Sequence, residues 1–347
     1  MMTDQSNLNK NKFKIVISVG DESGIGPEII LKALFSEEIP KNIEVLIVGS
    51  RINLEKTYSK LKYLGLKNIA DPNIYKIFDM QIPFNKDNRE KSYGHASFCY
   101  LKKAIEIVQK HPNSALVTGP ICKKSWAMAG HYYSGQTELL AESCKVKNVG
   151  MLFTAKSPIT GWRFNTLLAT THIPLCEVPK QLNADLIHTK LDLLSEFCSN
   201  YIKNPILKVA GLNPHAGEEG ILGNEEKDWI SKAITNWSNK NKRIRLIGPI
   251  SPDSCWNSSA LAWKDTKAIK HDGILAMYHD QGLIPIKVIA LNYSVNTTIG
   301  LPFIRTSPDH GTGFDIAGEG LAQSQSMVES IKTAIELTKN SRLFDTH

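Results

Sequence analysis

The chain has 347 residues, 42% hydrophobic and 22% charged, and its 41 Lys and Arg against 34 Asp and Glu give a net charge of +7. This is the composition of a globular protein of about two domains, which excludes intrinsic disorder, and no apolar run reaches the roughly 18 residues of a membrane-spanning helix. The basic residues are scattered and form no stripe typical of a nucleic-acid binder, so they indicate either a solvated face or attraction of an anionic substrate.

The first structured segments are a strand and a helix. Met1–Lys12 is polar and lacks the apolar core of a signal peptide, so we expect a cytoplasmic protein. Phe13–Val19 is apolar and β-branched, which predicts a buried strand. After a turn at Gly20–Gly24, Pro27 fits the first turn of a helix that continues to Leu34.

Strands and helices alternate along the rest of the chain. Further strands are predicted at 43–49, 114–120 (running into a turn), 166–171, 207–212 and 273–278, and helices at 97–109, 184–197 and 225–237. Such alternation favours an α/β fold with a largely parallel sheet. The six cysteines include no C-x-x-C pair, which indicates reduced thiols without a thiolate metal site.

Three of the predicted strands end in a polar loop that carries a histidine: His172, His215 and His279. Ligands bind beyond the carboxyl ends of strands in open α/β sheets, and imidazole suits zinc or cobalt. Each histidine alone also fits a hydrogen-bonded loop residue, and the separations match no local metal motif. Asp280 either orients its neighbouring ligand or forms and caps the turn.

A possible anion-binding stretch follows the third histidine. Lys287, Asn296 and Arg305 occur in apolar, strand-like surroundings. They fit contacts to a carboxylate or phosphate, or ordinary strand-end charges that reach solvent. Gln136 and Thr137 precede a helical run, where Thr137 fits either a helix cap or a phosphate contact at the helix N-terminus.

The glycines at the first strand–helix turn do not complete a dinucleotide fingerprint. Gly24 and Gly26 match its start, but Ile29 stands where a third Gly or Ala is required. This segment therefore predicts a tight turn from strand to helix.

Five sequence blocks occur in a specific order over most of the chain. They are LVTGP at 116–120, ATTH at 169–172, NPHAGE at 213–218, AMYHDQG at 276–282 and GLPFIRTS at 300–307. Together they resemble the 4-hydroxythreonine-4-phosphate dehydrogenase family of vitamin B6 biosynthesis, from about Lys14 to Leu337.

The resemblance implies two α/β/α lobes with a largely parallel sheet, similar to isocitrate and isopropylmalate dehydrogenases. The family unit would span 13–340. Residues 13–130 with 290–340 would form the lobe on the cofactor side, and 131–289 the lobe on the metal and dimer side. The active site would lie in a cleft at the interface of a homodimer, so both chains would contribute ligands.

The resemblance also implies a reaction. It is the NAD-dependent oxidation of 4-phosphohydroxy-L-threonine and its decarboxylation to 3-amino-2-oxopropyl phosphate, in pyridoxine 5′-phosphate biosynthesis. A divalent ion (zinc, magnesium or cobalt) would be held by His172, His215 and His279. Substrate contacts would be Gln136, Thr137, Lys287, Asn296 and Arg305. Lys287 and Asp280 are the candidate catalytic residues, and the base is either Asp280 or a metal-bound water.

The segment 309–318 also resembles the adenosine loop of isopropylmalate dehydrogenases, which bind NAD without a Rossmann fingerprint. This implies cofactor contacts at Gly311, Thr312, Asp315 and Ile316. A carboxylate at Asp315 would accept ribose hydroxyls and repel a 2′-phosphate, which predicts NAD over NADP. Alternatively, Asp315 caps a helix.

Two departures from the family pattern leave the substrate open. Gln136 stands where the family usually has His, and an amide can form hydrogen bonds but cannot carry positive charge. The stretch 157–165 is longer than usual and would reshape the pocket rim. Alternatives are a dehydrogenase of threonate or erythronate 4-phosphate, a three-histidine metallohydrolase without nicotinamide, and a non-catalytic sensor that binds metal or a phosphometabolite.

Overall fold

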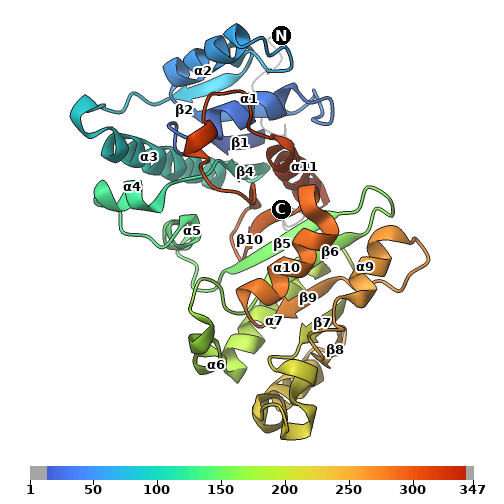
Figure 1. The fold of residues 1–347 in the computed structure, drawn as a ribbon. Coiled ribbons are helices and arrows are strands. Elements are labelled where there is room, and N and C mark those ends of the chain that lie inside the picture. Colours follow the sequence, from blue (N-terminus) through green and yellow to red (C-terminus); the bar gives the residue numbers. More distant parts are fainter. Residues whose placement is uncertain (1–13, 341–347) are drawn as a thin grey trace, which may run out of the picture. The chain divides into compact units, whose positions relative to one another are not determined.

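The computed structural model describes residues 14–340, which divide into two compact units (Figure 1). Unit 1 comprises residues 14–147 and 301–340, and unit 2 comprises 148–300. Segment 1–12, which carries the prediction about export, lies outside the described residues. The sequence-based boundaries near 130 and 290 differ from the observed ones because the strand at 295–299 pairs with the strand at 150–156 and so belongs to unit 2.

Unit 1 contains a parallel sheet of continuous apolar strands. Its strands, in spatial order, are β3 (Lys76–Asp79), β2 (Glu44–Gly49), β1 (Lys14–Ser18), β4 (Ser114–Thr118) and β11 (Arg305–Ser307). β1 and β4 are almost wholly buried, as expected of strands covered on both faces. The strands predicted at 13–19, 43–49 and 114–120 are present as β1, β2 and β4, of which β4 ends at Thr118 before the predicted turn, and residue 13 lies outside the described part of the chain.

The helices of unit 1 begin where the local sequence favours a start. They are α1 (Gly26–Phe35), α2 (Arg51–Tyr63), α3 (Arg89–Lys110), α4 (Lys123–Met128), α5 (Gln136–Cys144) and α11 (Gln325–Asn340), with 3-10 turns η1 (Pro72–Ile74), η2 (Lys86–Asn88) and η7 (Phe314–Ile316). Pro27 lies in the first turn of α1, as predicted. Ser50 caps α2 by accepting the Asn53 backbone N–H.

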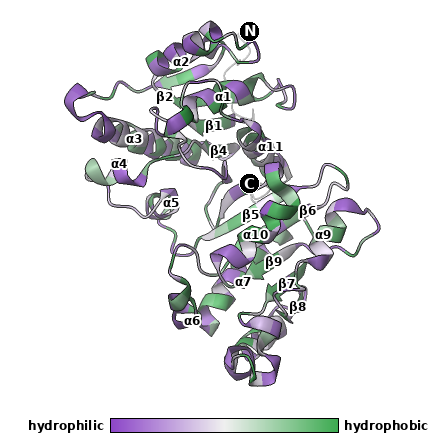
Figure 2. Cartoon of the chain, in the orientation of Figure 1, coloured by the Kyte–Doolittle hydropathy of each residue, from purple (hydrophilic) through white to green (hydrophobic). Residues whose placement is uncertain are grey.

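Unit 2 has a mixed sheet. Its strands, in spatial order, are β10 (Val295–Ile299), β5 (Gly150–Lys156), β6 (Arg163–Leu168), β9 (Gly273–Ala276), β7 (Ile206–Ala210) and β8 (Arg245–Ile250). β5 runs antiparallel to both β10 and β6, and the other pairs are parallel. Strands β5, β7 and β9 are mainly hydrophobic in Figure 2, consistent with a buried core. The prediction of a largely parallel α/β fold is confirmed.

The helices of unit 2 connect and flank these strands. They are α6 (Val178–Gln181), α7 (Ala184–Ser199), α8 (Ser231–Lys240), α9 (Asn257–Lys264) and α10 (His279–Ala290), with shorter turns η3 (Leu175–Glu177), η4 (Pro214–Gly220), η5 (Glu226–Ile230) and η6 (Leu291–Tyr293). The predicted strands at 166–171, 207–212 and 273–278 are present but end two or three residues earlier. Their polar ends form the connections in which the histidines occur.

One local expectation was wrong. Lys287 lies within helix α10 and not in a strand-like segment, because the apolar run around Pro285 continues a helix that tolerates this proline. The segment 157–165 is the β5–β6 hairpin turn and the start of β6. Ser157 Oγ accepts the backbone N–H groups of Ile159 and Thr160, and Trp162 is buried, so this turn packs onto the core of unit 2.

Within residues 14–340, no helix combines the length and apolarity needed to cross a bilayer.

Candidate active site

Two of the three predicted metal ligands converge at the carboxyl ends of neighbouring strands in unit 2. β6 and β9 are parallel, and Leu168 pairs with Ala276 at their ends. His172 follows β6, and His279 is the first residue of α10, directly after β9. Their ring centroids lie 5.3 Å apart with an interplanar angle of 44°. This is the convergence of strand ends that the sequence predicted.

Asp280 contacts the His279 ring and does not cap helix α10. Its Oδ1 lies 2.7 Å from His279 Nδ1 and accepts the ring N–H. This hydrogen bond leaves Nε2 of His279 as the ring atom with a lone pair for a ligand. Asp280 therefore fixes the orientation of the His279 ring.

His215 lies on unusual backbone after β7. Turn η4 has positive φ angles at four non-glycine residues, including 52° at His215 and 53° at Ala216. Left-handed backbone costs on the order of 1 kcal/mol for each non-glycine residue, so surrounding contacts must impose it. In the described part of the chain, no group of three or more His, Cys, Asp or Glu side chains is arranged to hold a metal ion.

Glu226 is one of the residues that hold this connection. Its side chain is buried, and Oε1 accepts the backbone N–H groups of Leu212 and Asn213 at 2.6 and 2.8 Å. Its Oε2 accepts the Asn213 side-chain amide at 2.8 Å. The sequence analysis missed this anchor, because Glu226 lies in a separate helical segment and matches no motif.

Gln281 joins two histidine-bearing connections. Its Oε1 accepts the Met277 N–H at 2.7 Å, just before His279, and its Nε2 donates to Gly211 O at 2.7 Å, at the start of the segment that leads to His215. Thr170 lies in the third such connection, which follows β6 and leads to His172. Its hydroxyl donates to Met277 O at 2.8 Å and so ties this connection to the one before His279. Gln281 and Thr170 are buried, so these hydrogen bonds are shielded from water.

A separate polar cluster in unit 1 surrounds Arg305. The guanidinium is 3% exposed and donates from one nitrogen to Thr118 Oγ1 at 2.7 Å and to Gln136 Oε1 at 3.0 Å. Gln136 in turn donates from Nε2 to Gly119 O at 3.0 Å. Burial lowers the pKa of Arg305 to about 10, so the group stays a cation at neutral pH.

This geometry assigns Gln136 a defined role. An amide donates to a carbonyl and accepts from a guanidinium at the same time, whereas a protonated histidine cannot accept a hydrogen bond. Thr137 lies in the first turn of α5, but the cap position is Gly135 and no side chain caps the helix. The expectation that Thr137 caps the helix was therefore wrong.

The remaining predicted substrate residues belong to unit 2. Lys287 is exposed on α10. Asn296 lies on β10, half-buried, and its Oδ1 is buried without a hydrogen-bond partner. Buried acceptors normally have a partner, so this atom is available to a ligand donor.

The predicted cofactor segment packs on the β1–α1 turn of unit 1. Ile25 N donates to Thr312 O at 2.8 Å, and a Cβ on Gly24 would lie 2.5 Å from the same oxygen. This close approach leaves no room for a side chain at position 24. It explains the glycine there without a Rossmann fingerprint. Asp315 lies exposed inside η7, whose cap position is Gly313, so Asp315 does not cap this helix.

The fold and these polar clusters are those of an α/β protein that binds a ligand beyond the carboxyl ends of its strands. Residues 41–334 match the family described as pyridoxal phosphate biosynthetic protein PdxA. The chain belongs to this family.

Relatives and solved structures agree along nearly the whole chain. A 4-hydroxythreonine-4-phosphate dehydrogenase of Synechococcus sp. (strain RCC307) is 47% identical over 328 residues, which cover 93% of this chain and 99% of the relative. One from Nostoc sp. (strain PCC 7120) is 45% identical and covers 94% of each chain. The crystal structure of the Klebsiella pneumoniae enzyme has a TM-score of 0.78 at 30% identity, covering 95% of this chain and 99% of that one. The predicted family and fold class are confirmed.

Proposed function

We propose that this chain is a cytoplasmic, NAD-dependent 4-hydroxythreonine-4-phosphate dehydrogenase. It oxidises the hydroxyl of 4-phosphohydroxy-L-threonine, and the resulting β-keto acid loses carbon dioxide to give 3-amino-2-oxopropyl phosphate. The observation that carries the proposal is the 47% identity, over 93% of the chain, to a relative of that name. The six cysteines are free thiols, which supports a reducing compartment.

Arg305 and Gln136 would hold an anionic group of the substrate. A buried cation fixed by Thr118 and Gln136 needs little reorganisation when it pairs with a phosphate or carboxylate. Thr137 lies in the first turn of the same helix as Gln136 and supplies a further contact. Lys287 and Asn296 in unit 2 would bind the substrate's other polar groups, with Lys287 or Asp280 moving a proton.

The imidazole donors suit a divalent metal such as zinc, magnesium or cobalt in kind, but within residues 14–340 of one chain they do not form a complete three-ligand group. His172, His215 and His279 would hold it, because Asp280 leaves Nε2 of His279 available and the three histidine-bearing connections are fixed to one another. When bound, the ion lowers the pKa of the substrate hydroxyl and stabilises negative charge on its oxygen.

The residues also fit NAD. Gly311, Thr312, Asp315 and Ile316 would hold it, and Asp315 is exposed and able to accept ribose hydroxyls. When bound, the nicotinamide accepts the hydride. Because Asp315 would repel a 2′-phosphate, we expect much slower turnover with NADP than with NAD at equal concentration.

We propose that the working form is a homodimer. Helix α10 and the adjacent η6 expose Ile284, Val288 and Leu291 by 62%, 78% and 72%. Ile284 and Val288, four residues apart, lie on one face of α10, and Leu291 follows at the end of the helix. Exposed apolar side chains grouped in this way favour contact with another chain. A second copy would also supply ligands that complete the metal site.

The first test is NADH formation by the purified protein with 4-phosphohydroxy-L-threonine, NAD and a divalent cation. Production that stops when a chelator is added supports the proposal. If NADH forms from D-threonate or D-erythronate 4-phosphate but not from this substrate, the chain is a dehydrogenase of that phosphorylated hydroxy acid. This second candidate is kept because Gln136 departs from the family pattern. No NADH from any of them would overturn the dehydrogenase assignment.

The metal ligands are tested by His172→Ala. We expect loss of both turnover and bound metal, measured by equilibrium dialysis followed by metal analysis. His111→Ala is the matched control, because His111 is an exposed histidine at the end of α3. Full activity of a His172→Ala protein that holds no metal would contradict the assignment.

A further inference from the structure

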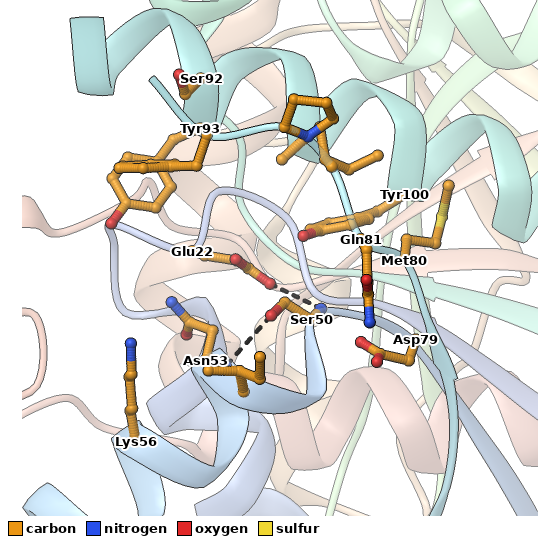
Figure 3. A pocket seen from close by; sticks show the side chains of 15 residues that line it. Glu22, Ser50, Asn53, Lys56, Asp79, Met80, Gln81, Ser92, Tyr93 and Tyr100 are labelled. Atoms are coloured by element: carbon orange, nitrogen blue, oxygen red, sulfur yellow. Dashed lines mark hydrogen bonds between the residues drawn. The ribbon is translucent and has the colours of Figure 1, made fainter. Parts of the chain in front are cut away.

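Unit 1 contains a cavity that none of the residues proposed above to bind substrate, metal or NAD lines. Its volume is about 430 Å³, within the range of small-molecule sites (Figure 3). Its inner end lies at the carboxyl ends of three parallel strands: Glu22 follows β1, Ser50 follows β2, and Asp79 ends β3. Ligands of α/β sheets bind at this edge. The position therefore indicates a binding site.

The inner end of the cavity presents a carboxylate. Glu22 Oε1 accepts the Ser50 N–H at 2.9 Å, and the buried Tyr100 hydroxyl also hydrogen-bonds to Glu22. Figure 3 shows the Glu22 carboxylate between Tyr100 and Ser50, directed into the cavity. A carboxylate has about four acceptor positions, so these two donors leave room for donors of a ligand.

Another part of the cavity lining is aromatic and apolar. Phe84 and Tyr93 pack edge to face with ring centroids 5.0 Å apart, and both line the cavity. Phe84 and Ile52, a further lining residue, are 47% and 57% exposed. Exposed apolar side chains that line a cavity provide a surface for a planar ring.

A basic group completes the site. Lys56 on α2 lines the cavity, and Figure 3 shows it beside Asn53, on the same helix whose N-terminus carries Ser50. An ammonium here favours an anionic substituent. The cavity thus combines an acceptor for hydroxyl donors, a flat apolar wall and a cation.

We propose that this cavity binds a ribonucleoside phosphate. The vicinal ribose hydroxyls donate to Glu22, the base packs against Phe84 and Tyr93, and the phosphate lies near Lys56. Two sources share this chemistry: a free nucleotide such as AMP, or one nucleoside half of NAD. The NAD source rests on the proposed function.

The test measures binding of AMP, 2′-deoxy-AMP and NAD by isothermal titration calorimetry. At pH 8.5, where Glu22 with its raised pKa of about 7 is ionised, we expect wild type to bind AMP about tenfold more tightly than 2′-deoxy-AMP, since a hydrogen bond to a charged acceptor is lost. Glu22→Gln is expected to weaken AMP about tenfold and to remove the preference over 2′-deoxy-AMP. Glu55→Gln, which changes a carboxylate on α2 outside the cavity, is the matched control.

The variants also distinguish the source. Weakening of both AMP and NAD by Glu22→Gln, with competition between them, assigns the cavity to the dinucleotide. Weakening of AMP alone assigns it to a free nucleotide. Phe84→Ala, which removes a half-exposed ring, is expected to weaken the same ligand several-fold by removing its stacking surface.

Two results would overturn the proposal. One is no AMP or NAD binding to wild type at millimolar concentration, and the other is unchanged affinity in a folded Glu22→Gln protein. Neither depends on turnover. If wild type forms NADH but Glu22→Gln binds AMP and NAD as wild type does, only the nucleotide-site proposal is refuted. If AMP binding requires Glu22 but no NADH is formed, the nucleotide-site proposal stands and the dehydrogenase proposal fails.

Discussion

Gln136 is the residue at which this chain departs from its family pattern, and the structure explains how it functions. Its amide accepts from Arg305 and donates to Gly119 O, so it fixes the guanidinium without adding a negative charge beside it. A carboxylate at the same position would neutralise that charge. The departure therefore preserves a buried cation for an anionic substrate.

Gln136→Glu should raise the KM for the phosphorylated substrate by about tenfold or more, because a Glu–Arg pair competes with the substrate anion. The measurement is steady-state NADH formation over a range of substrate concentrations. Gln109→Glu adds the same charge on an exposed part of α3 and is the control. An unchanged KM would argue against Arg305 as the anion contact.

The raised pKa of Glu22 predicts a pH-dependent contribution to stability. Burial raises its pKa from 4.5 to about 7, so the folded state binds this proton more tightly than the unfolded state does. Below pH 4.5 both states are protonated and the group contributes nothing. Above pH 7 both are ionised, and the folded state carries a penalty of up to about 3 kcal/mol.

Glu22→Gln should therefore raise the melting temperature at pH 8 and have little effect near pH 5. Thermal unfolding of wild type and variant between pH 5 and 8.5 measures this difference. The charged and titratable neighbours Asp21, Asp79, Tyr100 and Lys56 are the same in both proteins, so subtraction isolates Glu22. A difference independent of pH would show that Glu22 does not titrate in this range.

At the scale of elements, three connections of unit 2 depend on buried hydrogen bonds. Gln281 links the β9–α10 connection to the segment after β7, and Thr170 links the segment after β6 to Met277. The segment after β7 contains η4, where non-glycine residues have positive φ angles. These angles are locally unfavourable, so tertiary contacts must stabilise the segment. The histidines are therefore positioned through residues that do not themselves contact a ligand.

Gln281→Leu should weaken metal binding about tenfold and lower the free energy of unfolding by about 2 kcal/mol, since it leaves Met277 N–H and Gly211 O unpaired. Cobalt titration followed by visible absorption measures the affinity, and urea unfolding the stability. Gln325→Leu, on α11 in unit 1, is the control for the substitution itself. Lower stability with unchanged cobalt affinity would limit Gln281 to a structural role.

At the scale of the whole molecule, the exposed apolar face of α10 predicts self-association. Val288→Asp places a charge at its centre and should convert the dimer to a monomer, with loss of metal-dependent turnover. Light scattering after size exclusion measures the mass. Ile269→Asp, at an apolar residue of unit 2 that is 85% exposed and lies before β9, is the control. A dimeric Val288→Asp protein would exclude this face as the interface.

Local pattern was enough to predict most elements, because burial imposes a period on each segment. The strands at 13–19, 43–49 and 114–118 and the helix at 184–197 needed no tertiary information. Local pattern also explains the wrong prediction that Lys287 lies in a strand-like segment. A short apolar run is compatible with strand or helix, and only packing selected the helix.

The sequence by itself determined the α/β alternation, the family, and the strand ends that carry His172, His215 and His279. Tertiary structure alone decided which side chains meet: Arg305 with Gln136, Gln281 with Gly211, and Glu22 with Ser50. The physical reason is that periodicity encodes which residues are buried. The partner of a buried polar group depends instead on which strand ends become neighbours, and these come from distant parts of the chain.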